Sequence, residues 1–204
     1  LAVPLVADPD ARHVVVKTVL ACLSAEWLVR HCPDARVLLV ERHPYNVLSS
    51  WRDLGFVRSG REFDRVGAWA QARWGVAPPT DDAPHIARQA YFFGVLTAAL
   101  RETAAAHPAW VRTTHEHLCV DSAARFVALA TDLGLEWGER AAAFIAESDL
   151  GDSAEAATAT DRPFRTRRAT AEQPDRWRER LSEDERGTID ATLAPFPFDL
   201  VPET

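Results

Sequence analysis

The stretch DARVLLVERHPYNVLSS, from Asp34 to Ser50, determines the fold that the sequence predicts. Val37 to Val40 form a short continuous apolar run, typical of a strand buried on both faces of a parallel sheet. Arg42 follows this run, and Pro44 suits the first turn of a helix because its missing N–H costs nothing there. Ligands bind at such strand ends in open α/β sheets, and helix N-termini favour anions. The stretch therefore predicts half of a phosphate site, with Ser50 two helical turns beyond Arg42.

The composition is that of an ordinary globular domain. With 204 residues, 47% hydrophobic and 26% charged, the chain is expected to form a single domain over residues 1–204. No apolar run reaches the roughly 18 residues that cross a bilayer, and no basic segment leads into an apolar core as in a secretory signal. We therefore expect a cytoplasmic protein without a membrane partner. The net charge of -7 argues against general nucleic-acid binding.

The rarer residue types carry more information. Three cysteines, Cys22, Cys32 and Cys119, lack metal-ligand spacing and are interpreted as buried thiols, so no metal is expected. The chain contains no Met, which indicates that Leu1 lies inside a longer protein. Lys17 is the only lysine among 23 basic residues. Since an ammonium makes a point contact where a guanidinium makes a planar fork, Lys17 is a candidate site residue; a surface lysine left by chance is the alternative.

A second strand is predicted just before this stretch. The β-branched run His13–Val16 predicts a buried strand that ends at Lys17. A helix from Ser24 to about His31 then leads into the strand Arg36–Glu41. This order is that of a βαβ unit, in which Lys17 and Arg42 share the carboxyl edge of a parallel sheet.

The rest of the chain predicts further helices and one more strand. No regular element is assigned between Asp53 and Pro84, a segment that would cover the sheet edge or line an acceptor pocket. Gly151–Thr160 is small and acidic, which indicates a loop, and a basic cluster follows it. The predicted elements are a helix with one buried stripe at Ala83–Ala106, a strand at Ala109–Thr114, helices from Asp121 or Ser122 to Gly134 and at Glu139–Glu147, and a last helix from Ser182 to Leu193 with Glu185 in a capping box.

Three segments together resemble the sulfotransferases that use 3′-phosphoadenosine 5′-phosphosulfate (PAPS). The most specific is PDARVLLVERHPYNVLSS, from Pro33 to Ser50. It is similar to the strand and helix in which an Arg, and a Ser eight residues later, hold the 3′-phosphate of the cofactor. The resemblance implies that role for Arg42 and Ser50, and an Arg fork with a helical hydroxyl suits a phosphate.

The other two segments lie in the second half of the chain. THEHLCVDSAARFVALATDLGLEW, from Thr114 to Trp137, resembles the family's strand, turn and helix, and implies that His115 touches the nucleotide. The basic loop before Trp177 resembles the loop that folds over the 3′-phosphate, which implies a binding role for Arg167 and Arg168.

Lys17 looks like the lysine that follows the preceding strand in relatives, which include tyrosylprotein sulfotransferases. The resemblance implies that Lys17 is catalytic, because a positioned cation stabilises the negative charge that grows on the departing nucleotide. Two positions depart from the family's pattern. Val19 stands where many relatives have a histidine general base, and His43 replaces the usual Asp or Asn after the arginine.

The resemblance implies an α/β fold with a parallel sheet flanked by helices, a P-loop NTPase-like sulfotransferase fold that lacks its first strand–loop–helix. It implies sulfuryl transfer from PAPS, without a metal, to a hydroxyl or amine of a small-molecule, glycan or peptide acceptor.

Aromatic residues are candidates for an acceptor pocket or for the core: Trp51, Trp69, Trp74, Tyr91 and Phe92. Two alternatives stay open, a non-catalytic nucleotide-binding remnant and a kinase-like phosphotransferase, against which the missing phosphate loop speaks.

Overall fold

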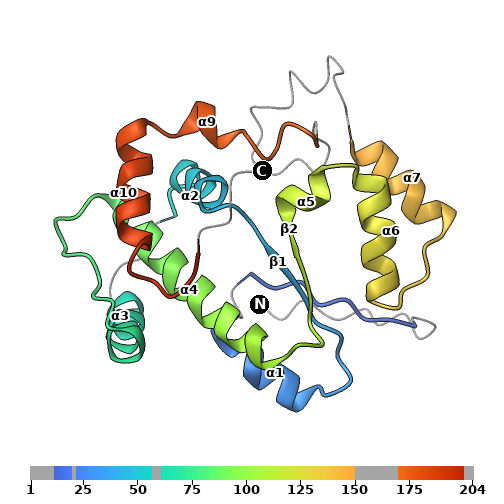
Figure 1. Cartoon of the computed structure of the whole chain (residues 1–204), viewed down its shortest axis with the longest axis horizontal. Helices are drawn as coiled ribbons and strands as arrows, with labels where there is room; N and C mark the ends of the chain where they lie inside the picture. Colours follow the sequence, from blue (N-terminus) through green and yellow to red (C-terminus); the bar gives the residue numbers. More distant parts are fainter. Residues whose placement is uncertain (1–11, 20–21, 57–60, 150–169, 200–204) are drawn as a thin grey trace.

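The computed structural model describes residues 12–19, 22–56, 61–149 and 170–199. Helices surround a small parallel sheet, so the predicted α/β class is confirmed at this level (Figure 1). No helix in these ranges is long and apolar enough to span a membrane. The elements are a 3₁₀ turn η1 (Cys22–Ser24), α1 (Ala25–His31), β1 (Leu38–Glu41), α2 (Pro44–Asp53), α3 (Arg61–Trp74), α4 (His85–Ala106), β2 (Val111–Thr114), α5 (His115–Cys119), α6 (Ser122–Asp132), α7 (Glu139–Ser148), α9 (Trp177–Arg180) and α10 (Glu183–Leu193).

The sheet pairs β1 with β2 in parallel. The register places Leu38 opposite Val111 and Glu41 opposite Thr114. These strands confirm the two predicted at Arg36–Glu41 and Ala109–Thr114, each somewhat shorter than expected. The prediction that the first of them is buried on both faces is wrong, because Leu39 is buried but Val40 is 46% exposed. Because the strands are parallel, both end at the same edge of the sheet, and α2 and α5 begin there.

The predicted strand at His13–Val16 is wrong. Residues 13–18 have no regular structure, and the side chains of Val14 to Val16 are 74% to 85% exposed. A strand needs a backbone partner, and within the described ranges only β1 and β2 pair. The segment instead crosses the sheet (Figure 1): Arg12 forms an ion pair with Glu136 at one end, and Val19 lies beside β1 at the other. The βαβ unit that would place Lys17 at a strand end is therefore not formed.

The long helix α4 is the centre of the hydrophobic core. It was predicted to bury one stripe, but its first half is buried on most sides because α2, α3 and α10 pack around it. Tyr91 and Phe92 belong to this core, one of the two roles that the sequence left open for them. The buried positions of α4 are Ile86, Ala87, Gln89, Ala90, Tyr91, Phe92, Gly94, Val95, Ala98, Ala99 and Ala104.

Helix α3 was not predicted, although its sequence carries a helical signal. Phe63 and Ala70 are buried seven residues apart, with Val66 packed against the core between them. Trp74 lies at the end of the helix, and its ring meets that of Trp69 edge-on at 4.9 Å. The surrounding Arg and Asp residues obscure this periodicity in the sequence.

Local capping and burial predictions were confirmed in part. The capping box of α10 is present: the Ser182 hydroxyl accepts from the Glu185 N–H at 3.2 Å, and the Glu185 carboxylate accepts from the Ser182 N–H at 2.9 Å. Asp121 precedes α6 as predicted, but its backbone is left-handed with φ of 52° and its side chain makes no capping bond. The buried-thiol prediction holds only for Cys119, since Cys22 is half-buried and Cys32 is exposed.

The close approach of Gly94 to Phe196 predicts the cost of a methyl group in the core. A Cβ at Gly94 would meet the Phe196 ring at 2.5 to 2.8 Å, whereas one at Gly187 on α10 would meet nothing within 4 Å. We expect Gly94→Ala to lower the free energy of unfolding by about 1–3 kcal/mol through overpacking. Gly187→Ala should raise it by roughly 0.5–1 kcal/mol through helix propensity. Urea unfolding of both variants measures this, and equal stability of the two would contradict the packing of α4 against Phe196.

Candidate functional site

The carboxyl edge of the sheet brings two predicted site residues together. Arg42 directly follows Glu41, and His115 directly follows Thr114, the residue paired with Glu41 in the parallel ladder. The Arg42 guanidinium also lies near α5. Burial raises the pKa of the Cys119 thiol to about 11, Glu116 adds to that rise, and the positive charge of Arg42 opposes it. The positive charge of Arg42 and the negative charge of Glu116 therefore both act on the side chain of Cys119 in α5.

Glu116 joins the two strand ends, and the sequence did not single it out. Its side chain is buried, with 4% of the residue exposed. Its Oε1 accepts from the His43 backbone N–H at 3.1 Å and from Asn46 Nδ2 at 3.2 Å. Asn46 Nδ2 also donates to the Pro174 carbonyl at 2.8 Å. A buried carboxylate is stable only when it is hydrogen-bonded, so Glu116 holds the turn after Arg42 against α5 and the C-terminal segment.

His43 caps the helix that follows Arg42. Its Nδ1 accepts from the Tyr45 N–H at 3.2 Å, so in the neutral ring the proton lies on Nε2. The ring is buried and stacks on Trp177, with centroids 5.7 Å apart and planes at 5°. The Tyr45 hydroxyl donates to Asp190 at 2.7 Å. His43 is thus the N-cap of α2 and connects this helix to α9 through Trp177.

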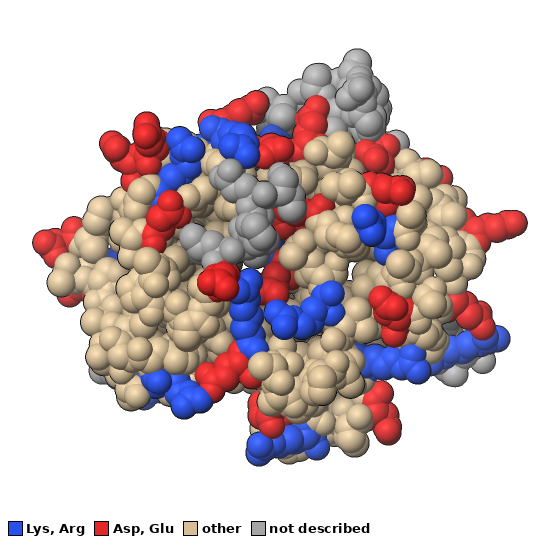
Figure 2. Space-filling view, in the orientation of Figure 1, with Lys and Arg blue, Asp and Glu red and all other residues tan. Residues whose placement is uncertain are grey.

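A hollow of about 160 Å³ lies beside Arg42, between β1, α2, α4 and the C-terminal segment. Its walls are mainly apolar, and Trp51 is the one residue of the predicted acceptor pocket among them. At its rim Glu41 accepts from Arg101 Nε at 2.5 Å and from Arg112 at 3.2 Å. Figure 2, which views the molecule as in Figure 1, shows basic side chains near the middle of the face turned to the reader, with acidic ones beside them. The apolar lining residues are Val19, Val40, Pro44, Val47, Trp51, Phe93, Leu96, Leu100 and Phe198.

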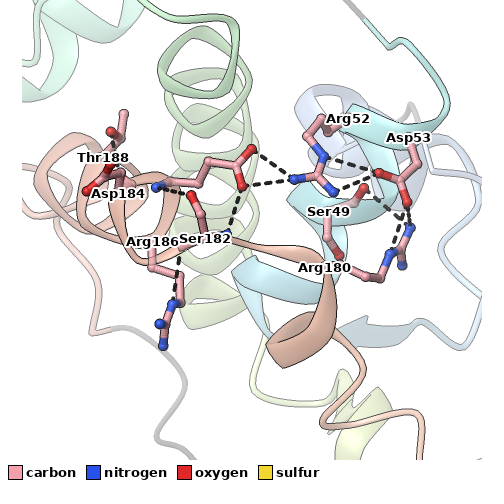
Figure 3. Close-up of polar contacts among 9 residues, drawn as sticks. Ser49, Arg52, Asp53, Arg180, Ser182, Asp184, Arg186 and Thr188 are labelled. Atoms are coloured by element: carbon pink, nitrogen blue, oxygen red, sulfur yellow. Dashed lines mark hydrogen bonds and ion pairs between the residues drawn. The ribbon is translucent and has the colours of Figure 1, made fainter.

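An ion-pair network holds the other end of α2 (Figure 3). Arg52 pairs with Glu185 at 2.8 Å and with Asp53 at 3.0 Å. Arg180 donates through Nε to Asp53 at 3.0 Å and reaches the Ser49 carbonyl at 3.4 Å. The network therefore joins α2 to α9 and α10, so that both ends of α2 are held by polar contacts.

The remaining predicted site residues are less closely assembled. Ser50 is half-buried on α2, four residues beyond Asn46 and so on the side of the helix that faces Pro174. Lys17 is exposed in the irregular segment, two residues before Val19, which lines the hollow with Arg42. Arg167 and Arg168 lie outside the described residues. Within the described ranges, no group of three His, Cys, Asp or Glu side chains is placed to hold a metal ion.

The network around α2 predicts a pH-dependent stability. Partial burial alone would raise the pKa of Glu185, but hydrogen bonds from Arg52 and from the Ser182 N–H hold it below its ordinary value. The same balance, with Arg180 and Arg52 as donors, lowers the pKa of Asp53. The unfolded chain then binds more protons than the folded chain below about pH 5, so stability is lost as the pH falls through the folded pKa values.

Glu185→Gln should make this loss shallower and lower the free energy of unfolding at pH 7 by about 0.5–1.5 kcal/mol. Glu183→Gln removes an exposed carboxylate from the same turn and is the matched control. Urea unfolding from pH 7 to pH 3 measures both. Identical pH profiles for the two variants would contradict a stabilising role for the pair of Glu185 with Arg52.

No family model, curated protein or solved structure matches the chain. The resemblance to PAPS-dependent sulfotransferases therefore stays a prediction from the motifs around Arg42 and His115. The geometry that accompanies those motifs is the shared strand edge, the start of α2 and the contact of Glu116 with both sides.

Proposed function

We propose that this chain binds the 3′-phosphate end of PAPS at Arg42 and takes part in sulfuryl transfer to a hydroxyl or amine acceptor. The observation that carries the proposal is the strand edge, where Arg42 and His115 directly follow paired residues of two parallel strands. Ligands of open α/β sheets bind outside the carboxyl ends of the strands. The residues of the strongest sequence motif therefore occupy the place where the fold favours a ligand.

The start of α2 suits a phosphate for two reasons. Pro44 begins a helix of ten residues, whose N-terminal dipole attracts an anion. The Arg42 guanidinium supplies a fork that binds two phosphate oxygens at once. Glu116 keeps the intervening turn in place through the His43 N–H, which reduces the ordering cost of binding. Ser50 adds a hydroxyl donor on the same helix, and His115 supplies a ring beside the nucleotide.

The reaction requires charge stabilisation and a place for the acceptor. Bound PAPS supplies the sulfuryl group: an acceptor oxygen or nitrogen forms the new bond to sulfur as the bond from sulfur to the nucleotide's phosphate oxygen breaks. The bisphosphate is the leaving group, and the acceptor's proton passes to water. Lys17 stabilises the negative charge that develops on that leaving oxygen. The apolar hollow beside Arg42 receives the non-reacting part of the acceptor, where it excludes water.

Titration with adenosine 3′,5′-bisphosphate tests the binding site. Arg42→Ala should weaken binding by about 10- to 100-fold, the loss expected for a charge-assisted phosphate contact. Arg65→Ala is the matched control, because it removes an exposed arginine from α3. Equal affinities of the two variants, or a preference for ATP with Mg²⁺, would overturn the proposal.

Lys17→Ala separates the chemical step from binding. It should leave the affinity for the bisphosphate unchanged and lower the turnover of PAPS by about 100-fold, the order of loss for one transition-state contact. Turnover is followed as bisphosphate release with a panel of phenols, sugars and tyrosyl peptides. Near-normal turnover of Lys17→Ala would show that Lys17 has no catalytic role.

A further inference from the structure

The edge of β2 that faces away from β1 offers backbone groups for hydrogen bonding. The Val111 N–H donates to the Val37 carbonyl at 3.0 Å, so Val111 faces β1. Since successive residues of a strand direct their backbone groups to opposite sides, Arg112 directs its N–H and C=O away from β1, and Thr114 directs its N–H there. The Thr114 carbonyl belongs to the N-cap of α5 and accepts the first bond of that helix. Within the described ranges β2 has β1 as its one strand neighbour. An open edge of this kind is a template for a further strand.

Helix α6 lies along this open edge and forms a groove with it. Figure 1 shows α6 beside β2, and residues of both elements line one hollow of about 340 Å³. Leu118, Ala128 and Leu129 supply apolar surface, while β2 supplies its backbone. An extended segment that adds to a strand edge is bound by main-chain hydrogen bonds, and a neighbouring helix provides pockets for alternate side chains.

The charge of the groove is opposite to that of the whole protein. Arg112, Arg125 and His117 line it, with Asp132 as its one acidic residue. The chain as a whole has a net charge of -7. Arg112 also pairs with Glu41, but Arg125 is exposed on the first turns of α6 and forms no ion pair within the described ranges. A locally basic groove on an acidic protein favours an acidic partner and disfavours a second copy of the chain.

We propose that this groove binds an acidic peptide segment in extended conformation, which pairs with β2 as an additional strand. The main-chain bonds to Arg112 and Thr114 supply affinity that is independent of sequence. The basic side chains select for acidic residues, and the apolar floor accepts every second side chain. No residue that lines this groove also lines the hollow beside Arg42, and the inference does not depend on the proposed nucleotide site.

Fluorescence anisotropy with a labelled eight-residue peptide of alternating Glu and Val tests the charge requirement. Arg125→Glu should weaken binding at least tenfold, as should replacement of the peptide's Glu residues by Lys. Arg140→Glu is the matched control, since it reverses an exposed charge near the start of α7 and should leave binding unchanged. Equal loss in both protein variants would mean that net charge alone governs binding and would overturn the proposal.

Two N-methylated forms of the peptide test strand pairing. Methylation of alternate residues in one register removes the N–H groups that bond to β2, and methylation in the other register does not. One form should lose at least tenfold in affinity and the other should bind as the parent does. Amide hydrogen exchange at Arg112 and Thr114 should slow in the complex. Equal binding of both forms, or full displacement by inorganic phosphate or by single-stranded RNA, would show an anion site without an added strand and overturn the proposal.

Discussion

The burial of α4 is the constraint on which the rest of the structure depends. Val95 is fully buried, and α2 and α10 pack on α4 through Leu48 and Ile189, which are also fully buried. Gly94 permits the close approach of Phe196 from the C-terminal segment. Because protein interiors are close-packed, this arrangement sets the position of α2 relative to the sheet. The position of α2 in turn sets where the chain leaves β1 and where Arg42 lies.

Glu116 fixes the turn between β1 and α2, which apolar packing alone does not position. Apolar contacts place α2 over α4, but a hydrogen-bonded carboxylate determines how the turn between β1 and α2 meets α5. The polar groups at this edge are therefore held from two sides, by Glu116 near Arg42 and by the pair of Arg52 with Glu185 at the far end of α2. An anion site needs such rigidity, since groups that are already ordered lose little entropy when a ligand binds.

The sequence was most informative where local chemistry decides the structure. The strand before Arg42 was predicted from an apolar run, and the helix that begins at Pro44 from a proline whose missing N–H costs nothing in the first turn. The position of His115 directly after a strand was also predicted. The prediction failed at His13–Val16, because β-branched residues favour a strand without supplying its partner. Glu116 could not be found from local patterns, since its partner His43 lies 73 residues earlier in the chain.

A crystal structure of the chain with adenosine 3′,5′-bisphosphate is the most direct test of the strand-edge site. We expect the 3′-phosphate to lie within hydrogen-bond distance of the Arg42 guanidinium and close to the N-terminus of α2, with Glu116 still bonded to the His43 N–H. A bisphosphate bound elsewhere, such as between Arg112 and Arg125 in the groove beside β2, would contradict it.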